Sequence, residues 1–404
     1  MLFKRGGLLA ISFMLLFCVS GCNNSSEEKT KVTKAIDDVQ VVQKNDREIT
    51  DICLDLYRKA EEEKKISDLE TIHGIVKRFG EKGYPAVDSK NQMDMVQAEQ
   101  VIRFCEMVEK KEEAEITILE IDDLGGLIKY DLHTKDGSVN VVRNYYQYKN
   151  GKIRKKDVGN YEADDWKYTK EGYLMFSGVW FSKEQYILTL SETEEHKAFR
   201  VQPLAERYRE LNRKYLMPVG YEQNNMFLVD WDEHEFGDLN FYDMYDIFYP
   251  NINAKSVPCD VDDDLGGGTV YNISRDEFEH VIMTYFKIDS ETLQSKTVYD
   301  SKNSAYEYRP RGFYEAEYPE YPYSEVVGDR ENGDGTIALT VQVVFPYAGD
   351  SKVYTHEVVV RPFEDGRVQY VSNRVISSKD NHKGTWYKPR LTKEGWREIY
   401  EKSY

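Results

Sequence analysis

The fold is decided by residues 336–376, which read TIALTVQVVFPYAGDSKVYTHEVVVRPFEDGRVQYVSNRVI. Three runs in this stretch are rich in β-branched and aromatic residues, a composition typical of strands: Thr336–Phe345, Lys352–Arg361 and Arg367–Ile376. Short turns separate the runs, and Glu364-Asp-Gly366 indicates a hairpin because Asp-Gly accepts the positive φ that tight turns require. The stretch therefore predicts an antiparallel meander.

A helix is predicted upstream of this meander. Ser274-Arg-Asp-Glu277 has the form of a capping box, in which the first and last side chains satisfy free backbone N–H groups. The apolar stripe that follows recurs at helical spacing and consists of Phe278, Val281, Ile282, Tyr285 and Phe286. A helix packed on an antiparallel meander is an α+β arrangement. In topology alone, without any motif, it resembles the curved sheet of the cystatin or nuclear-transport-factor-2 type.

The N-terminal half shows the same change from helical to strand periodicity. Helices are expected around Ile49–Ala60, from a capping box at Ser67-Asp-Leu-Glu70 through Phe79, and over Met93–Glu113. The strands expected next are Glu115–Ile121, Leu127–His133, Val139–Tyr148, Lys152–Val158, Leu174–Phe181 and Gln185–Leu190. Lys135-Asp-Gly137 and Lys149-Asn-Gly151 are hairpin signals, and a helix over Lys197–Leu216 is expected to close this half.

One short motif occurs twice. Thr169-Lys-Glu-Gly172 and Thr392-Lys-Glu-Gly395 each follow a Trp and precede an aromatic residue, and a set of strands comes before each. Duplication of an α+β unit would explain the match. Coincidence in a chain rich in Lys and Glu is the alternative.

The first 22 residues indicate export and lipid attachment. Lys4 and Arg5 precede an apolar run, Leu8–Phe17, which is too short to span a bilayer and is typical of a cleaved signal. Val19-Ser20-Gly21-Cys22 resembles the bacterial lipobox, in which the cysteine receives the lipid. We therefore expect Cys22 to carry acyl chains such as palmitate and to hold the chain at the extracytoplasmic face of the cell membrane. An ordinary signal peptide cleaved nearby is the alternative.

Five segments are expected along the chain. Residues 1–21 form the lipoprotein signal peptide, and residues 22–45 contain the lipidated Cys22 and a flexible, polar tether. Residues 46–216 form a helical segment with an antiparallel β-sheet domain. Residues 217–272 are an acidic, aromatic connecting region, and residues 273–404 form the C-terminal α+β domain.

Charge narrows the range of partners. The chain has a formal net charge of −18, which repels phosphates and argues against nucleic acid as a partner. It also contains 31 tyrosines, and Tyr is enriched both in half-buried strands and at binding surfaces. Two cysteines, Cys53 and Cys105, are expected on apolar helix faces. They either form a disulfide or remain buried thiols.

The strongest binding-surface candidate is an aromatic segment interleaved with arginine and proline. Sugars bind such surfaces by stacking on rings while polar groups bond their hydroxyls. Its residues are Tyr306, Tyr308, Arg309, Arg311, Tyr314, Tyr318, Tyr321 and Tyr323. The alternative is that these rings pack onto the sheet or a neighbouring domain.

Two acidic motifs are weaker candidates for metal binding. Asp260, Asp262 and Asp264 stand at positions 1, 3 and 5 of a calcium-loop pattern. Leu265 occupies the place of the usual Gly and Tyr271 that of the bidentate Glu, so a solvated acidic loop is the alternative. In the second motif Asp230, Asp232 and His234 would share one face of an extended segment, as ligands of a divalent metal or as an acid and a base. A polar strand edge or loop is the alternative.

The C-terminal stretch VVFPYAGDSKVYTHEVVVRPFEDGRVQYVSNRVI, with the lipobox and the polar tether, is similar to uncharacterised lipoproteins of clostridia-like Gram-positive bacteria. That family is a domain of unknown function. The resemblance covers most of the mature chain and implies a cell with a single membrane. It implies no activity and no site residues.

Three functions are compared. The first is a non-enzymatic binding or accessory module held at the membrane, with a glycan, the cell wall or a protein as partner, and calcium as the one cofactor considered. The second is an extracytoplasmic glycan or cell-wall hydrolase that uses acidic residues near Asp230–Glu235. The third, a solute-binding lipoprotein of a transporter, is disfavoured because such proteins alternate strands and helices. The sequence contains no nucleophile-elbow, zincin, P-loop or dinucleotide pattern.

Overall fold

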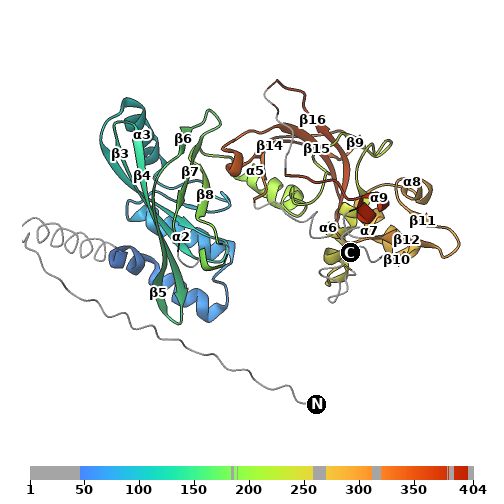
Figure 1. Cartoon of the computed structure of the whole chain (residues 1–404), viewed down its shortest axis with the longest axis horizontal. Coiled ribbons are helices and arrows are strands. Elements are labelled where there is room, and N and C mark those ends of the chain that lie inside the picture. Colours follow the sequence, from blue (N-terminus) through green and yellow to red (C-terminus); the bar gives the residue numbers. More distant parts are fainter. Residues whose placement is uncertain are drawn as a thin grey trace, which may run out of the picture. The chain divides into compact units, whose positions relative to one another are not determined.

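A computed structural model describes residues 46–182, 186–188, 190–257, 270–311, 320–379, 381 and 386–398 (Figure 1). The chain divides into two compact units, residues 1–52 and 53–404. In the first unit the described residues, 46–52, are helical. In the second unit the helical run at its start ends at residue 63. All elements below belong to the second unit, and they form the expected α+β class of fold.

The first half of this unit packs two helices on an antiparallel meander. Helices α2 (Leu69–Glu81) and α3 (Ala98–Lys110) each bury an apolar stripe against strand β2. The sheet has the order β1-β2-β3-β4-β5. Its strands are β1 (Ala86–Asp88), β2 (Ala114–Ile121), β3 (Leu127–Lys135), β4 (Ser138–Lys149) and β5 (Lys152–Glu162). The strands predicted for this meander are therefore confirmed.

Two hairpins of this sheet turn where the sequence predicts. Asp136 and Gly137 have φ of 56° and 90°, and Asn150 and Gly151 have φ of 53° and 73°. Two successive positive φ values match the right-handed twist of the flanking strands, which is why Asp-Gly and Asn-Gly occupy these positions.

A small sheet completes the first core. Its order is β6-β7-β8, with β6 (Asp165–Tyr168), β7 (Tyr173–Trp180) and β8 (Thr193–Arg200). The expected strand Gln185–Leu190 is wrong, because its described residues 186–188 are helical. The expected helix Lys197–Leu216 is also wrong at its start, because residues 197–200 pair with β7 and Pro203 follows them. Helix α5 (Glu206–Leu211) and a π-helical turn, Asn212–Leu216, come only after that proline.

The second half also packs helices on an antiparallel meander. Its large sheet has the order β13-β14-β15-β16-β9, with β9 (Trp231–Asp232), β13 (Tyr323–Glu331), β14 (Ile337–Val344), β15 (Thr355–Pro362) and β16 (Val368–Val375). Between β14 and β15 lies a 3-10 turn, Pro346–Ala348. Helix α7 (Arg275–Tyr285) packs against β16, and helix α6 (Phe241–Asn253) lies beside α7. The meander predicted for residues 336–376 is confirmed, whereas the likeness to a cystatin or nuclear-transport-factor-2 sheet stays a prediction.

Short elements surround α7. A three-stranded sheet of order β10-β12-β11 is formed by β10 (Tyr271–Ser274), β11 (Tyr299–Asp300) and β12 (Ala305–Tyr308). Helix α8 (Ser290–Ser295) lies between α7 and β11 in the sequence. Helix α9 (Lys393–Trp396) lies near the end of the described chain.

The two predicted capping boxes have different outcomes. Ser274 is the N-cap of α7, and its hydroxyl accepts a hydrogen bond from the Glu277 backbone N–H at 3.3 Å. The box predicted at Ser67 is wrong: Asp68 is the N-cap of α2, and its side chain makes no capping hydrogen bond.

The region expected to connect the two domains contributes to the second core. Trp231 on β9 and Phe241, Met244 and Phe248 on α6 belong to the same hydrophobic cluster as α7 and the meander. Leu216, at the predicted end of the first domain, belongs to that cluster as well. The predicted domain boundaries stay predictions.

Element order supports an internal duplication, but the tetrapeptide motif does not. Helices α2 and α3 precede the meander β2–β5, as α6 and α7 precede the meander β13–β16. Thr169–Gly172 forms the turn between β6 and β7, in which Gly172 has a φ of 88°. Thr392–Gly395 instead begins α9, where the Thr392 hydroxyl accepts a hydrogen bond from Gly395 N–H at 3.2 Å. Duplication stays a prediction.

Candidate functional site

A cavity of about 660 Å³ lies in the second half of the unit. Four segments line it: residues 237–242 at the start of α6, residues 296–298 after α8, residues 307–309 at the end of β12, and residues 390–396 around α9. Its volume falls in the range of pockets that take small molecules.

Charged side chains of both signs line the cavity. The cations are Lys296, Arg309 and Arg390, and the carboxylates are Asp238, Glu307 and Glu394. Lys296 is held in place, because its Nζ donates to the Gly237 carbonyl at 2.8 Å and lies 3.4 Å from Glu235. The described lining residues include three charged side chains of each sign, so the cavity offers both donors and acceptors.

Tyr242 closes one wall between α6 and the segment after α8. Its hydroxyl accepts a hydrogen bond from the Val298 backbone N–H at 2.8 Å. The Asn240 side chain caps α6 by accepting from Tyr242 N–H and Asp243 N–H at 3.0 and 3.2 Å. These bonds position the half-buried ring of Tyr242 and the start of α6 at the cavity.

A buried ionic network supports the cavity from behind. The carboxylate of Asp243, on α6, is fully buried and accepts from Arg311 Nη2 at 2.8 Å, Arg390 Nε at 2.8 Å and the Tyr387 hydroxyl at 3.0 Å. Arg390 also pairs with Asp246 one turn along α6 and donates to a carbonyl of the cavity lining. Burial lowers the pKa of Arg390, which its carboxylate partners oppose. Two arginines and two aspartates therefore neutralise one another inside the protein.

The structure separates the residues of the predicted aromatic surface. Tyr306 and Tyr308 are buried in the second core, where their hydroxyls donate to Glu279 and Asp246 at 2.8 and 2.7 Å. These two rings are therefore packed in the core, which was the alternative to a binding surface, and a ligand cannot reach them. Arg309 lines the cavity.

The other residues predicted for the aromatic surface lie in different parts of the protein. Arg311 is buried and belongs to the network behind the cavity. Tyr321 is half-buried and packs against the second core. Tyr323 lies on β13, and its hydroxyl accepts from the Asn91 side chain at 3.2 Å. Tyr314 and Tyr318 lie outside the described residues.

Most of the cavity was missed because its residues are far apart in sequence. Arg390, Thr392, Glu394 and Trp396 all come from the stretch that contains the second Thr-Lys-Glu-Gly motif. The repeat is visible in the sequence of that stretch, but no pattern in it indicates a site. Asp238 and Lys296 carry no local signal at all, since single charged residues in turns are usually solvated.

The predicted metal sites gain no support among described residues. Asp260, Asp262 and Asp264 lie outside the described residues, so the calcium loop stays a prediction. In the second motif, Asp230 accepts from the Val375 backbone N–H at 2.7 Å, and Asp232 accepts from the N–H groups of His234 and Glu235. Within the described part of the chain, no group of three or more His, Cys, Asp or Glu residues is placed to hold a metal ion.

Cys53 and Cys105 are both buried as thiols, which matches the alternative to a disulfide. Burial raises the pKa of Cys105 to about 12, so this thiol stays protonated at neutral pH. Cys22, the predicted lipidation site, lies outside the described residues.

A family model, described as a family of unknown function (DUF6070), matches residues 40–390. The chain belongs to this family. No curated protein and no solved structure matches the chain. The match to DUF6070 spans both halves of the second unit, and the predicted likeness to a domain of unknown function is confirmed. In the described part of this DUF6070 chain, no helix has the length and apolar character needed to cross a membrane.

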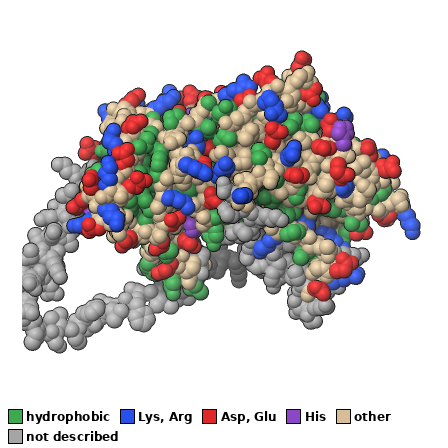
Figure 2. Space-filling model, turned by 90° about the horizontal axis from the view of Figure 1, so that it is seen from above, with side chains coloured by type: hydrophobic (Ala, Val, Ile, Leu, Met, Phe, Trp, Pro, Cys, Tyr) green, Lys and Arg blue, Asp and Glu red, His purple; other side chains and the backbone are tan. Residues whose placement is uncertain are grey.

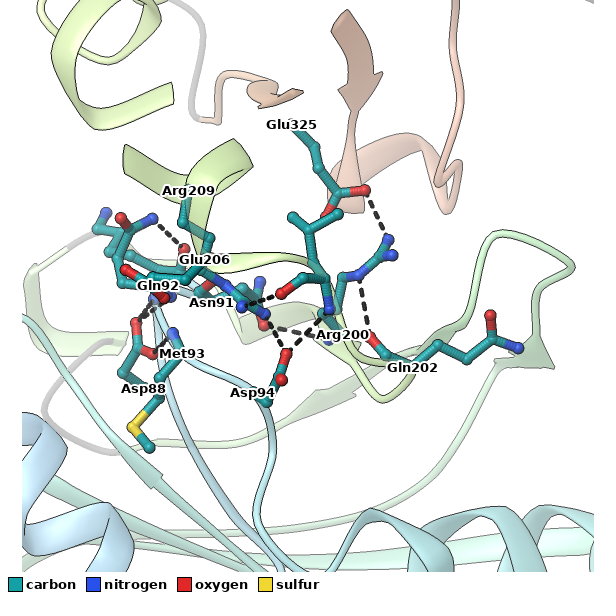
Figure 3. A network of polar contacts seen from close by, with 12 residues as sticks. Asp88, Asn91, Gln92, Met93, Asp94, Arg200, Gln202, Glu206, Arg209 and Glu325 are labelled. Atoms are coloured by element: carbon teal, nitrogen blue, oxygen red, sulfur yellow. Dashed lines mark hydrogen bonds and ion pairs between the residues drawn. The ribbon is translucent and has the colours of Figure 1, made fainter. Parts of the chain in front are cut away.

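A second polar centre joins β8 to β13 in this DUF6070 protein (Figure 3). The buried Glu325 on β13 accepts from Arg200 Nη1 and from the Tyr173 hydroxyl, each at 2.6 Å. Burial raises the pKa of Glu325, and the positive charge of Arg200 opposes this rise. Arg200 N–H also donates to Asn91 Oδ1 at 3.1 Å.

The same centre continues to helix α5. Arg209 Nη2 pairs with Asp94 at 2.7 Å, and its Nε donates to the Asn91 carbonyl at 3.0 Å (Figure 3). Asp88 accepts from the backbone N–H groups of Gln92 and Met93 at 2.9 and 3.0 Å, which fixes the loop that carries Asn91. Because these groups satisfy one another and leave a space of only about 10 Å³, this centre is structural.

Proposed function

We propose that this chain is an extracytoplasmic lipoprotein, attached to the cell membrane through Cys22, whose cavity binds a polar ligand of the glycan or cell-wall type. The observation that carries the ligand assignment is the cavity of about 660 Å³ with three cations, three carboxylates and the ring of Tyr242 in its lining. The activity proposed is binding, not turnover.

The lining suits a neutral or zwitterionic ligand rich in hydroxyl groups. Carboxylates such as Glu307 and Glu394 accept hydrogen bonds from hydroxyls, while Lys296 and Arg309 donate to ring and hydroxyl oxygens. An aromatic face such as that of Tyr242 packs on the apolar C–H face of a sugar. Balanced charge adds no preference for a polyanion.

The anchor and location rest on the sequence. The basic start, the apolar run Leu8–Phe17 and the lipobox ending at Cys22 support attachment by acyl chains, palmitate among them. The similarity to clostridia-like Gram-positive lipoproteins supports a cell with one membrane. Under this proposal the cavity lies on the wall side of the membrane, where glycans are found.

Calorimetric titration of the full chain with muropeptides and neutral polysaccharide fragments tests the ligand. Arg309→Ala and Glu307→Gln should each weaken binding at least tenfold, since each removes a charged group from the cavity lining. Arg330→Ala is the matched control, because Arg330 is an exposed arginine on β13 away from the cavity, and its affinity should equal that of the parent. Binding that survives both cavity variants would place the ligand elsewhere.

The same samples, assayed with and without calcium, test the competing assignments. Depolymerisation of the fragments would replace binding by hydrolysis as the function. Binding that requires calcium would direct attention to Asp260, Asp262 and Asp264. Thermal unfolding of each variant separates a lost contact from a lost fold.

Metabolic labelling with a palmitate analogue tests the anchor. In a Gram-positive host the full chain should incorporate the label and remain with the membrane fraction. Cys22→Ser should abolish both. If the protein appeared in the culture medium without the palmitate label, the segment would be an ordinary cleaved signal peptide instead.

A further inference from the structure

The connection between β7 and β8 exposes several large apolar side chains together. Those described there are Phe181, Tyr186, Ile187, Leu188 and Leu190, whose exposed fractions range from 44% to 81%. We call these five residues the hairpin tip. Single exposed apolar residues are ordinary on a protein surface, but contiguous ones mark an interaction site.

Local bonds hold the tip in this form. The Tyr186 N–H donates to the Ser182 carbonyl and the Leu190 N–H donates to the Tyr186 carbonyl, both at 2.9 Å. The rings of Phe181 and Tyr186 pack on each other with centroids 5.4 Å apart. Successive helical hydrogen bonds direct the intervening side chains Ile187 and Leu188 outward.

We propose that the hairpin tip inserts into the interface of the lipid bilayer to which the chain is anchored. This inference rests on the proposed attachment through Cys22. Exposed aromatic and branched aliphatic side chains on one short segment are the residues that enter the boundary between headgroups and acyl chains.

The chain outside the described residues supports a bilayer as the occupant. Cys22 is followed by 23 residues before residue 46, and a chain of that length spans at most about 80 Å when fully extended. An anchored tip would therefore meet the bilayer at a high effective concentration, so that a few side chains suffice for contact.

Charge indicates which lipids the tip would meet. Glu192 and Glu194 follow the tip and are exposed, so the described charges next to it in sequence are acidic. On the face that Figure 2 draws, acidic and basic side chains are interspersed. Contact with the bilayer is then apolar and independent of anionic lipid. It should persist with phosphatidylcholine and in high salt.

The test uses the full lipidated chain in phosphatidylcholine vesicles. A nitrobenzoxadiazole dye is attached at Leu188→Cys on a Cys259→Ser background, in which Cys53 and Cys105 are buried. Leu124→Cys is the matched control, since Leu124 lies in the turn between β2 and β3, outside the tip, and is 76% exposed against 81% for Leu188.

The dye at position 188 should become at least twofold brighter on vesicles and be quenched by doxyl-labelled lipid, whereas the dye at position 124 should not change. Adding Ile187→Glu to the labelled chain should remove at least half of the increase. Both effects should be the same in low and in high salt.

Three outcomes would overturn the proposal, and they are distinguishable. Equal emission at positions 188 and 124 in protein that floats with the vesicles would reject insertion while the anchor stands. Protein that does not float would reject the anchor, and the insertion inferred from it would fall as well. Brightening at Leu188→Cys without vesicles that grows with protein concentration would make a second copy of the chain the occupant.

Discussion

Arg200 on β8 and Glu325 on β13 form a buried ion pair with 2.6 Å between Nη1 and Oε2, although 125 residues separate them in sequence. The pair lies where the small sheet of the first half meets the large sheet of the second half. Each charge has left water and is compensated by the other, so the energetic effect of the pair appears mainly when one partner is removed.

Removing one partner of this pair should destabilise the protein strongly. We expect Glu325→Gln to lower the free energy of unfolding by about 3–5 kcal/mol, because Arg200 would stay buried without its carboxylate. Urea unfolding followed by circular dichroism measures the change. The double variant Arg200→Met/Glu325→Leu should lose less than the sum of the single variants.

An ion pair between β13 and β15 that is open to water provides the comparison. Arg330 and Glu357 lie 3.5 Å apart with much of both side chains in water. Glu357→Gln should change the free energy of unfolding by less than about 1 kcal/mol. Similar losses at Glu325 and Glu357 would contradict the buried-pair account.

Removing one charge from the buried network behind the cavity should destabilise the protein as strongly as removing Glu325. Asp243→Asn removes the charged carboxylate that Arg311 and Arg390 share, and we expect a loss of about 3–5 kcal/mol in the free energy of unfolding. Asp365→Asn is the control, because Asp365 pairs with Arg367 in a largely exposed turn. A variant at Asp243 as stable as the one at Asp365 would show that the arginines find other partners.

Acid should destabilise the protein through His356. This fully buried imidazole donates from Nδ1 to Asn373 Oδ1 at 2.7 Å, and its Nε2 accepts from the Tyr221 hydroxyl at 2.8 Å, since the Asn373 amide group already donates to a backbone carbonyl. Burial lowers the pKa of His356 to about 4, although the Asn373 bond opposes the shift. The neutral ring therefore belongs to the folded state.

The unfolded chain binds a proton on His356 below about pH 6.5, whereas the folded chain resists protonation until about pH 4. The contribution of His356 to the free energy of unfolding is fully present above about pH 6.5 and is lost as the pH falls towards about 4. The loss between these two pH values should be about 3 kcal/mol. Urea unfolding at pH 7 and pH 4 should show a smaller loss in His356→Gln. His133→Gln, at a more exposed histidine, should lose as much as the parent.

Gly178 on β7 should tolerate no side chain. A Cβ at this position would overlap the ring of Tyr161, which stacks on Trp180 with centroids 5.4 Å apart. Gly178→Ala should therefore lower the free energy of unfolding by about 1–3 kcal/mol. Gly333→Ala is the control, because nothing lies within 4 Å of a Cβ there, and thermal unfolding should show little change. If Gly178→Ala and Gly333→Ala had equal melting temperatures, the ring of Tyr161 would move aside without an energetic cost.

Local patterns predicted the elements that local chemistry determines. The stripe on α7 and the Asn150-Gly151 turn were predictable because helix periodicity and positive φ act over a few residues. Residues 197–200 form a strand and not the expected helix, because their pairing with β7, which is a tertiary contact, overrides local propensity.

The candidate site was less predictable for the same physical reason. Tyr308 looks like a surface aromatic in sequence, yet Asp246, 62 residues away, satisfies its hydroxyl in the core. Arg309, its neighbour, does reach the cavity. Arg390 gains its place only from the aspartates of α6, which no spacing along the chain connects to it.

The charge balance of the cavity has a consequence for association kinetics. A protein of net charge −18 surrounds itself with a negative potential that slows the approach of polyanions, while equal numbers of opposite charges line the cavity among the described residues. Long-range steering therefore plays little part in selecting a ligand that enters there. Its association rate should vary little with ionic strength, and discrimination should reside in how slowly the fitting ligand leaves.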